Sequence, residues 1–114
     1  MATIKNFNGV TLLRVENCVI KEFNGTIRYR IDDNRVKDFC GRTLYVLDGE
    51  RVKNFSGQTL LYISNNQVKT FNGQTIARYD FSCIKNFNGV TQYRIEGFLS
   101  HREMMALLAI MYAN

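Results

Sequence analysis

Residues 36–49 read VKDFCGRTLYVLDG, and a close relative of this stretch occurs six times in the 114-residue chain. Each copy starts with Ile or Val followed by Lys. A Phe stands three positions after the start, and a Gly follows two positions later. The copies begin at residues 4, 20, 36, 52, 68 and 84, sixteen residues apart, without insertion or deletion. A constant period of this kind predicts a repeat architecture.

Two turn signals divide each copy. The first is Asn8-Gly9 or an equivalent, and the second follows eight residues later, as in Glu16-Asn17 and Asp48-Gly49. Such dipeptides favour two-residue type I′ turns. The six-residue segments between them are rich in β-branched and aromatic residues, which predicts strands. A helix would be interrupted by a turn former about every eight residues. Asp80-Phe81 fits this scheme poorly, so we expect a local distortion there.

We therefore predict a mostly β protein, a twelve-stranded antiparallel meander of six 16-residue hairpin repeats (residues 2–99). The meander closes into a barrel or flower-like ring around a buried helix at 100–113, and 1–114 form a single domain. Ser100 and Glu103 make a capping box, and the run Met104 to Ala113 is apolar on every side, as in a buried helix. A splayed ring with the helix across one end is the main alternative, and an open solenoid is the weaker one.

Strand alternation assigns the two faces of the sheet. The Ile or Val that starts each copy lies on the buried face, with partners such as Tyr45 and Leu47. Alternation also puts the repeated Phe on the opposite, basic face. A β-bulge in the Ile-Lys-x-Phe strand would turn both apolar residues inward, and we favour that arrangement. The basic face carries Lys5, Lys21, Lys37, Lys53, Lys69, Lys85, Arg14, Arg30, Arg78 and Arg94.

The repeated Ile/Val-Lys-x-Phe-x-Gly-x-Thr-Leu-x-Tyr-x-Ile-Asp-Gly pattern resembles bacterial hairpin-repeat proteins of the β-flower kind, over nearly the whole chain. That resemblance implies the ring fold but transfers little function, since such families are largely of unknown function. The expected architecture is also similar to tubby-like and scramblase-like barrels, which surround a hydrophobic helix. No sequence motif supports this second likeness, and fold alone does not carry function.

Catalysis is not expected, and we predict no catalytic, cofactor-binding or metal-binding residues. The one histidine, His101, is interpreted as a polar residue at the barrel mouth, because no set of nucleophile, base and acid surrounds it. A carboxylate recurs at one turn position of most repeats, and ordinary turn chemistry explains it. A ring of these carboxylates that binds a cation is the weaker alternative. Three cysteines, at different repeat positions, are interpreted as space-filling thiols in a reducing compartment. The recurring carboxylates are Glu16, Asp32, Asp48, Asp80 and Glu96.

The predicted function is a non-enzymatic structural or interaction module that meets a protein partner or a copy of itself. The alternative is an anionic partner, either nucleic acid or acidic lipid headgroups, bound by the lysine and arginine belt. A net charge of +5 suits that alternative. We see no targeting signal and no apolar run long enough to cross a membrane, so a cytoplasmic location is expected.

Overall fold

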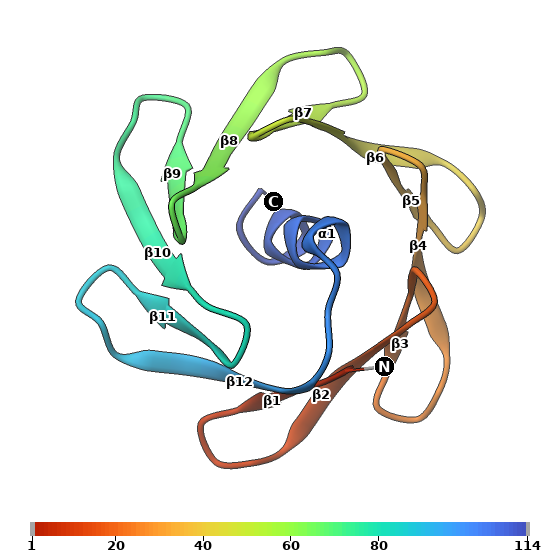
Figure 1. Ribbon diagram of the computed structural model, residues 1–114. Helices are drawn as coiled ribbons and strands as arrows, with labels where there is room; N and C mark the ends of the chain where they lie inside the picture. The colour runs from red at the N-terminus through yellow and green to blue at the C-terminus, as the bar shows by residue number, and fades with distance from the viewer. Residues whose placement is uncertain (1, 114) are drawn as a thin grey trace.

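A computed structural model describes residues 2–113 as twelve antiparallel strands closed into a barrel around one helix (Figure 1). Each strand pairs with its neighbours in sequence, and the first pairs with the last. The predicted meander barrel is therefore confirmed. The elements are β1 (Ala2–Asn6), β2 (Thr11–Glu16), β3 (Val19–Glu22), β4 (Ile27–Asp32), β5 (Arg35–Asp38), β6 (Thr43–Asp48), β7 (Arg51–Asn54), β8 (Thr59–Ser64), β9 (Gln67–Thr70), β10 (Thr75–Tyr79), β11 (Cys83–Asn86), β12 (Thr91–Gly97) and α1 (His101–Tyr112).

The barrel is a short, wide disc of 36 × 34 × 20 Å, and its six hairpins lean outward like petals (Figure 1). One end of the disc, here called the tip end, carries the loops within hairpins: 7–10, 23–26, 39–42, 55–58, 71–74 and 87–90. The other, the linker end, carries the turns that join successive hairpins: 17–18, 33–34, 49–50, 65–66 and 80–82. In a meander all loops of one kind must lie at one end, so the two ends differ chemically.

The core lies between the inner wall and α1, which passes through the middle of the ring and does not lie across one end (Figure 1). Met104, Leu107 and Leu108 are fully buried, as predicted for a helix that is apolar all round. The residue that starts each repeat is also fully buried, at Ile4, Ile20, Val36, Val52, Val68 and Ile84. The helix fills the cavity that ring closure creates, and burial of these side chains is the main source of stability.

The turns at the linker end lie one residue later than predicted. Asn17 and Cys18 both have positive φ, at 50° and 64°, as a type I′ turn requires. In the third repeat, Leu47 consequently pairs with Val52 and not with Glu50. The pairing is displaced by two residues, and because side chains alternate with period two, the predicted buried face is nevertheless correct.

Because Asn6 pairs with Val10 by a hydrogen bond, three residues (7–9) remain in the first tip loop, and the prediction of a two-residue turn at Asn8-Gly9 is wrong. The Gly9 N–H donates to the Asn6 carbonyl and the Asn6 N–H donates to the Val10 carbonyl, both at 3.0 Å. Gly9 has φ 86°, which completes a type I turn followed by a left-handed residue. Phe7 is thus the first loop residue and no longer obeys strand alternation.

A β-bulge occurs in every hairpin, but in the strand after the loop. Ile4 pairs with Leu13 and Lys5 with Thr11, which leaves Leu12 as the extra residue. The bulge therefore does not lie in the Ile-Lys-x-Phe strand and cannot turn the Phe inward. The extra residues are Leu12, Arg28, Leu44, Leu60, Ile76 and Gln92.

The helix is attached to the wall at the linker end. Glu103 completes the predicted capping box, because its Oε1 accepts from the Ser100 N–H at 3.0 Å while Ser100 Oγ accepts from the Glu103 N–H at 3.1 Å. Its Oε2 also accepts from the Cys18 N–H at 3.1 Å, in the turn between β2 and β3. One buried carboxylate therefore caps the helix and connects it to the barrel.

The expected distortion at Asp80-Phe81 is present. Phe81 does not adopt positive φ, and β10 ends at Tyr79, before Asp80. The Asp80 carboxylate accepts from the Ser82 and Cys83 N–H groups at 2.7 and 2.9 Å. The side chain thus supplies the acceptor for a turn in which a bulky residue disfavours a left-handed backbone.

Candidate docking surface

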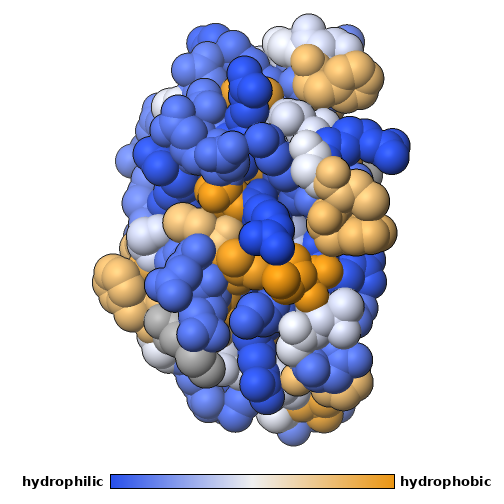
Figure 2. All heavy atoms as spheres, turned by 90° about the vertical axis from the view of Figure 1, so that its right-hand side faces the viewer, coloured by the Kyte–Doolittle hydropathy of each residue, from blue (hydrophilic) through white to orange (hydrophobic). Residues whose placement is uncertain are grey.

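Six exposed phenylalanines surround the tip end and are here called the phenylalanine rim. Their exposed fractions run from 61% at Phe23 to 77% at Phe55. The prediction that they face the core is wrong, because each stands in a loop and not in a strand. Figure 2 shows pale-orange apolar groups at intervals along one edge of the disc. The rim consists of Phe7, Phe23, Phe39, Phe55, Phe71 and Phe87.

Each tip loop is held by hydrogen bonds from its own residues. In the first hairpin, Asn6 Oδ1 accepts from the N–H groups of Asn8 and Val10, at 2.9 and 3.0 Å. This Asx arrangement satisfies donors that would otherwise need water. Equivalent bonds of 2.9–3.0 Å run from Ser56 and Gln58 to Asn54, from Asn88 and Val90 to Asn86, and from Cys40 and Arg42 to Asp38.

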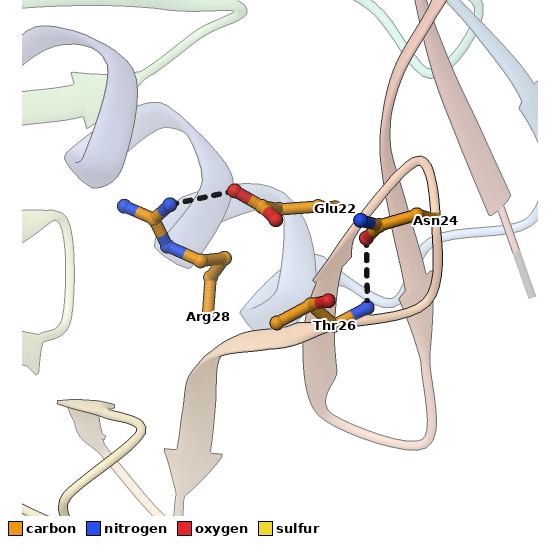
Figure 3. A network of polar contacts seen from close by, with 4 residues as sticks. All are labelled: Glu22, Asn24, Thr26 and Arg28. Carbon is orange, nitrogen blue, oxygen red and sulfur yellow. Dashed lines mark hydrogen bonds and ion pairs between the residues drawn. The ribbon is translucent and has the colours of Figure 1, made fainter.

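The loop between β3 and β4 is also held by its own polar side chains, but different residues make the contacts (Figure 3). Glu22 occupies the Asx position and instead forms an ion pair with Arg28, with 2.6 Å between Oε1 and Nη1. Asn24 Oδ1 accepts from the Thr26 N–H at 3.1 Å and supports the loop from within. The hydrogen bond and charge of Glu22 raise the pKa of the Arg28 guanidinium.

Further apolar side chains extend the surface inward from the rim. Val10 and Val90 are each 56% exposed beside their tips. A pocket of about 250 Å³ is lined by Phe23, Tyr29 and, from the C-terminal half of the helix, Ile110. The helix therefore points its C-terminal end toward the tip end. An exposed Phe at every tip, with these apolar neighbours, makes the tip end a candidate docking face.

All six lysines and four arginines of the predicted belt lie on the outer wall. At four neighbouring junctions between hairpins an arginine faces a lysine across the strands, an unfavourable pairing in a sheet. These four pairs are here called the basic arc. The other two junctions place Val46 opposite Lys53 and Tyr62 opposite Lys69. The basic arc consists of Arg78–Lys85, Arg94–Lys5, Arg14–Lys21 and Arg30–Lys37.

The recurring carboxylates do not form a ring for a cation. Four of the five approach the belt lysine of the next repeat, so the arginines and Lys85 carry the excess positive charge of the arc. A hydrogen bond from Lys37 lowers the pKa of Asp32, and one from Lys53 lowers the pKa of Asp48. The pairs are Lys5–Glu96 at 2.9 Å, Lys21–Glu16 at 4.0 Å, Lys37–Asp32 at 2.9 Å and Lys53–Asp48 at 2.8 Å.

Other residues considered from the sequence lie apart from this face. His101 is exposed in the first turn of α1, at the linker end. Cys18 and Cys83 are half-buried, but Cys40 is exposed at a tip, so its description as a space-filling thiol is wrong. Among residues 2–113, no three His, Cys, Asp or Glu side chains form a group able to hold a metal ion.

Comparison with known proteins places this barrel in no established group. No protein-family model, no curated protein and no solved structure matches the chain. Within the described residues, no helix has the length and apolar character that a membrane crossing requires.

Proposed function

We propose that this chain is a non-enzymatic interaction module that docks onto a partner surface through its phenylalanine rim. The observation that carries the proposal is the exposure of the same aromatic residue at all six tips, from Phe23 at 61% to Phe55 at 77%. Full burial of one such side chain contributes about 1.5–3 kcal/mol. Six of them around one face supply enough free energy for stable docking even when each is only partly covered.

A second function, binding of an anionic partner through the basic arc, is favoured by a separate observation. Four adjacent junctions oppose Arg and Lys directly, although such pairs oppose folding. A chain selected for stability alone would gain by placing an uncharged residue opposite each lysine, as Val46 stands opposite Lys53. The resemblance to β-flower-like hairpin-repeat proteins, also a proposal, is supported by the outward-leaning hairpins and adds no function of its own.

The docking proposal is tested with p-benzoylphenylalanine, a photoreactive residue that inserts into C–H bonds of protein or lipid. It replaces Phe39 at a tip in one variant and Phe98, near the start of α1, in the other. The two positions are matched, with exposed fractions of 68% and 73%. After illumination in the expressing cell, intact mass spectrometry should find adducts mainly on the Phe39 variant. Equal labelling at both positions, or none at Phe39, would refute the proposal.

A further inference from the structure

The geometry of the tip end points to an acidic lipid bilayer as the surface on which the phenylalanine rim docks. This inference rests on the proposed docking function and names its partner. In this arrangement the disc lies flat, with the helix axis along the membrane normal and the Phe side chains at the boundary between headgroups and acyl chains. Three properties of the tip end favour lipid over protein.

The first property is the arrangement of the aromatic groups. Each tip offers one Phe between polar neighbours, and the six tips are spread around a disc 36 Å wide. A flat, deformable surface contacts all six at once, whereas a protein partner would need six separate pockets on a ring. Isolated aromatic side chains at loop tips suit the membrane interface, where each can insert without its neighbours.

The second property is the state of the loop backbone. The boundary between headgroups and acyl chains offers less water than bulk solution, so an unpaired N–H group opposes insertion there. In the loop around Phe7, the Asn8, Gly9 and Val10 N–H groups already donate to Asn6. The same pattern holds at Asn54, Asn86 and Asp38. These three N–H groups of each such tip therefore keep their hydrogen bonds when the tip leaves bulk water.

The third property is charge. The chain carries a net charge of +5, so a second copy is repelled and an acidic surface is attracted. The barrel is only 20 Å thick, so every charge on its wall lies within about two Debye lengths (roughly 8–10 Å each) of a membrane at the tip end. The basic wall is therefore attracted to phosphatidylserine and other acidic lipids, most strongly through the residues nearest the surface.

The test is vesicle flotation of the purified full chain. Vesicles of phosphatidylcholine with phosphatidylserine should carry the protein upward, and vesicles of phosphatidylcholine alone should carry far less. The double variant F7S/F55S should lower the partition coefficient about 100-fold, at about tenfold for each partly buried Phe.

The matched control is F81S/F98S, which removes two exposed phenylalanines from the linker end, where their exposed fractions are 49% and 73%. It should bind like the unmodified protein. Equal losses in the two double variants would overturn the inference. If the unmodified protein fails to float while the Phe39 crosslinker captures protein or a second copy, docking stands and the lipid assignment is wrong. Failure of both experiments would reject docking as well.

The charge contribution is measured with two triple variants of equal net charge. The first, R14Q/R30Q/R94Q, removes three arginines of the basic arc. The second, R35Q/R51Q/R102Q, removes three arginines near the linker end. The first should reduce binding to acidic vesicles more than tenfold, at a loss of several-fold for each arginine, and the second by about threefold. Equal effects would show that only net charge matters and would overturn the flat orientation.

Discussion

The two ends of the barrel are built from the same repeat, yet an exposed Phe recurs at every loop of the tip end and at only one turn of the linker end, that of residues 80–82. At the linker end, Asn17-Cys18 and Asn65-Asn66 accept positive φ at both positions, and the turns are tight and polar. At the tip end, three-residue loops lift a Phe out of the sheet. The difference shows that loop length, and not strand pattern, decides where the aromatic residues point. It also separates the end that anchors the helix from the end that we propose docks on a partner.

Removal of residues 100–114 should have the largest effect. The helix contributes a continuous buried run from Glu103 to Ile110, and without it the inner wall at both ends is open to water. We expect aggregation or loss of the cooperative unfolding transition, measured by urea denaturation followed by circular dichroism. A monomeric truncated chain that unfolds cooperatively would contradict the role of the helix as the core.

Substitution E103A should have the next largest effect, because it breaks the attachment at the linker end alone. Loss of the helix cap and of the acceptor for the Cys18 N–H should destabilise the protein by about 2–4 kcal/mol. E103Q, which keeps one acceptor oxygen, should lose about half as much. The exposed neighbour R102Q is the control, and chemical denaturation gives the free energies. A loss in E103A no larger than in R102Q would show that the attachment is not needed.

Glycine substitutions distinguish the two kinds of loop directly. Gly57 at a tip has φ 88°, with no atom within 4 Å of an added Cβ, so G57A introduces backbone strain without a steric clash. A cost of about 1–2 kcal/mol is expected. Gly49 at the linker end has φ 61°, close to the value that Asn65 adopts at the same repeat position, so G49N should change stability by less than about 0.5 kcal/mol. Equal costs in the two denaturation curves would mean that the loops do not differ as described.

The smallest effect concerns the exposed carboxylates beside the belt. Lys53 lowers the pKa of Asp48 in the folded state. The Asp48 carboxylate therefore contributes to stability at pH values above its unfolded-state pKa of about 3.9. The contribution is lost as the pH falls through the folded-state pKa. D48N should therefore melt slightly lower than the unmodified protein at pH 7, and the difference should vanish in strong acid. Melting temperatures measured across that range test the sign, and a difference that grows in acid would contradict it.

Strand count, strand order and the buried face follow from local sequence because they depend only on repeat length and alternation. Leu47 pairs with Val52, two residues beyond the Glu50 that the turn signal predicts, because such a signal also permits the turn at a neighbouring position. The exposure of the phenylalanines was not predicted, for a related reason. An Asn-Gly pair suits both two-residue and three-residue loops, and only the second makes Phe7 a loop residue. The Asx residue three positions before the Gly, as at Asn6, is the signal that could have identified the longer loop.

The sequence by itself determined a twelve-stranded meander, an inward Ile/Val face and a capped apolar helix, because these depend on local periodicity and on hydrophobic burial. Only the tertiary structure decided the loop lengths, the bulge after each loop and the exposure of the phenylalanines, since cross-strand pairing selects among local turns of similar free energy. It also brought Cys18 to Glu103 and set each arginine of the basic arc opposite its lysine. Those contacts join residues on different elements, and ring closure is what places them side by side.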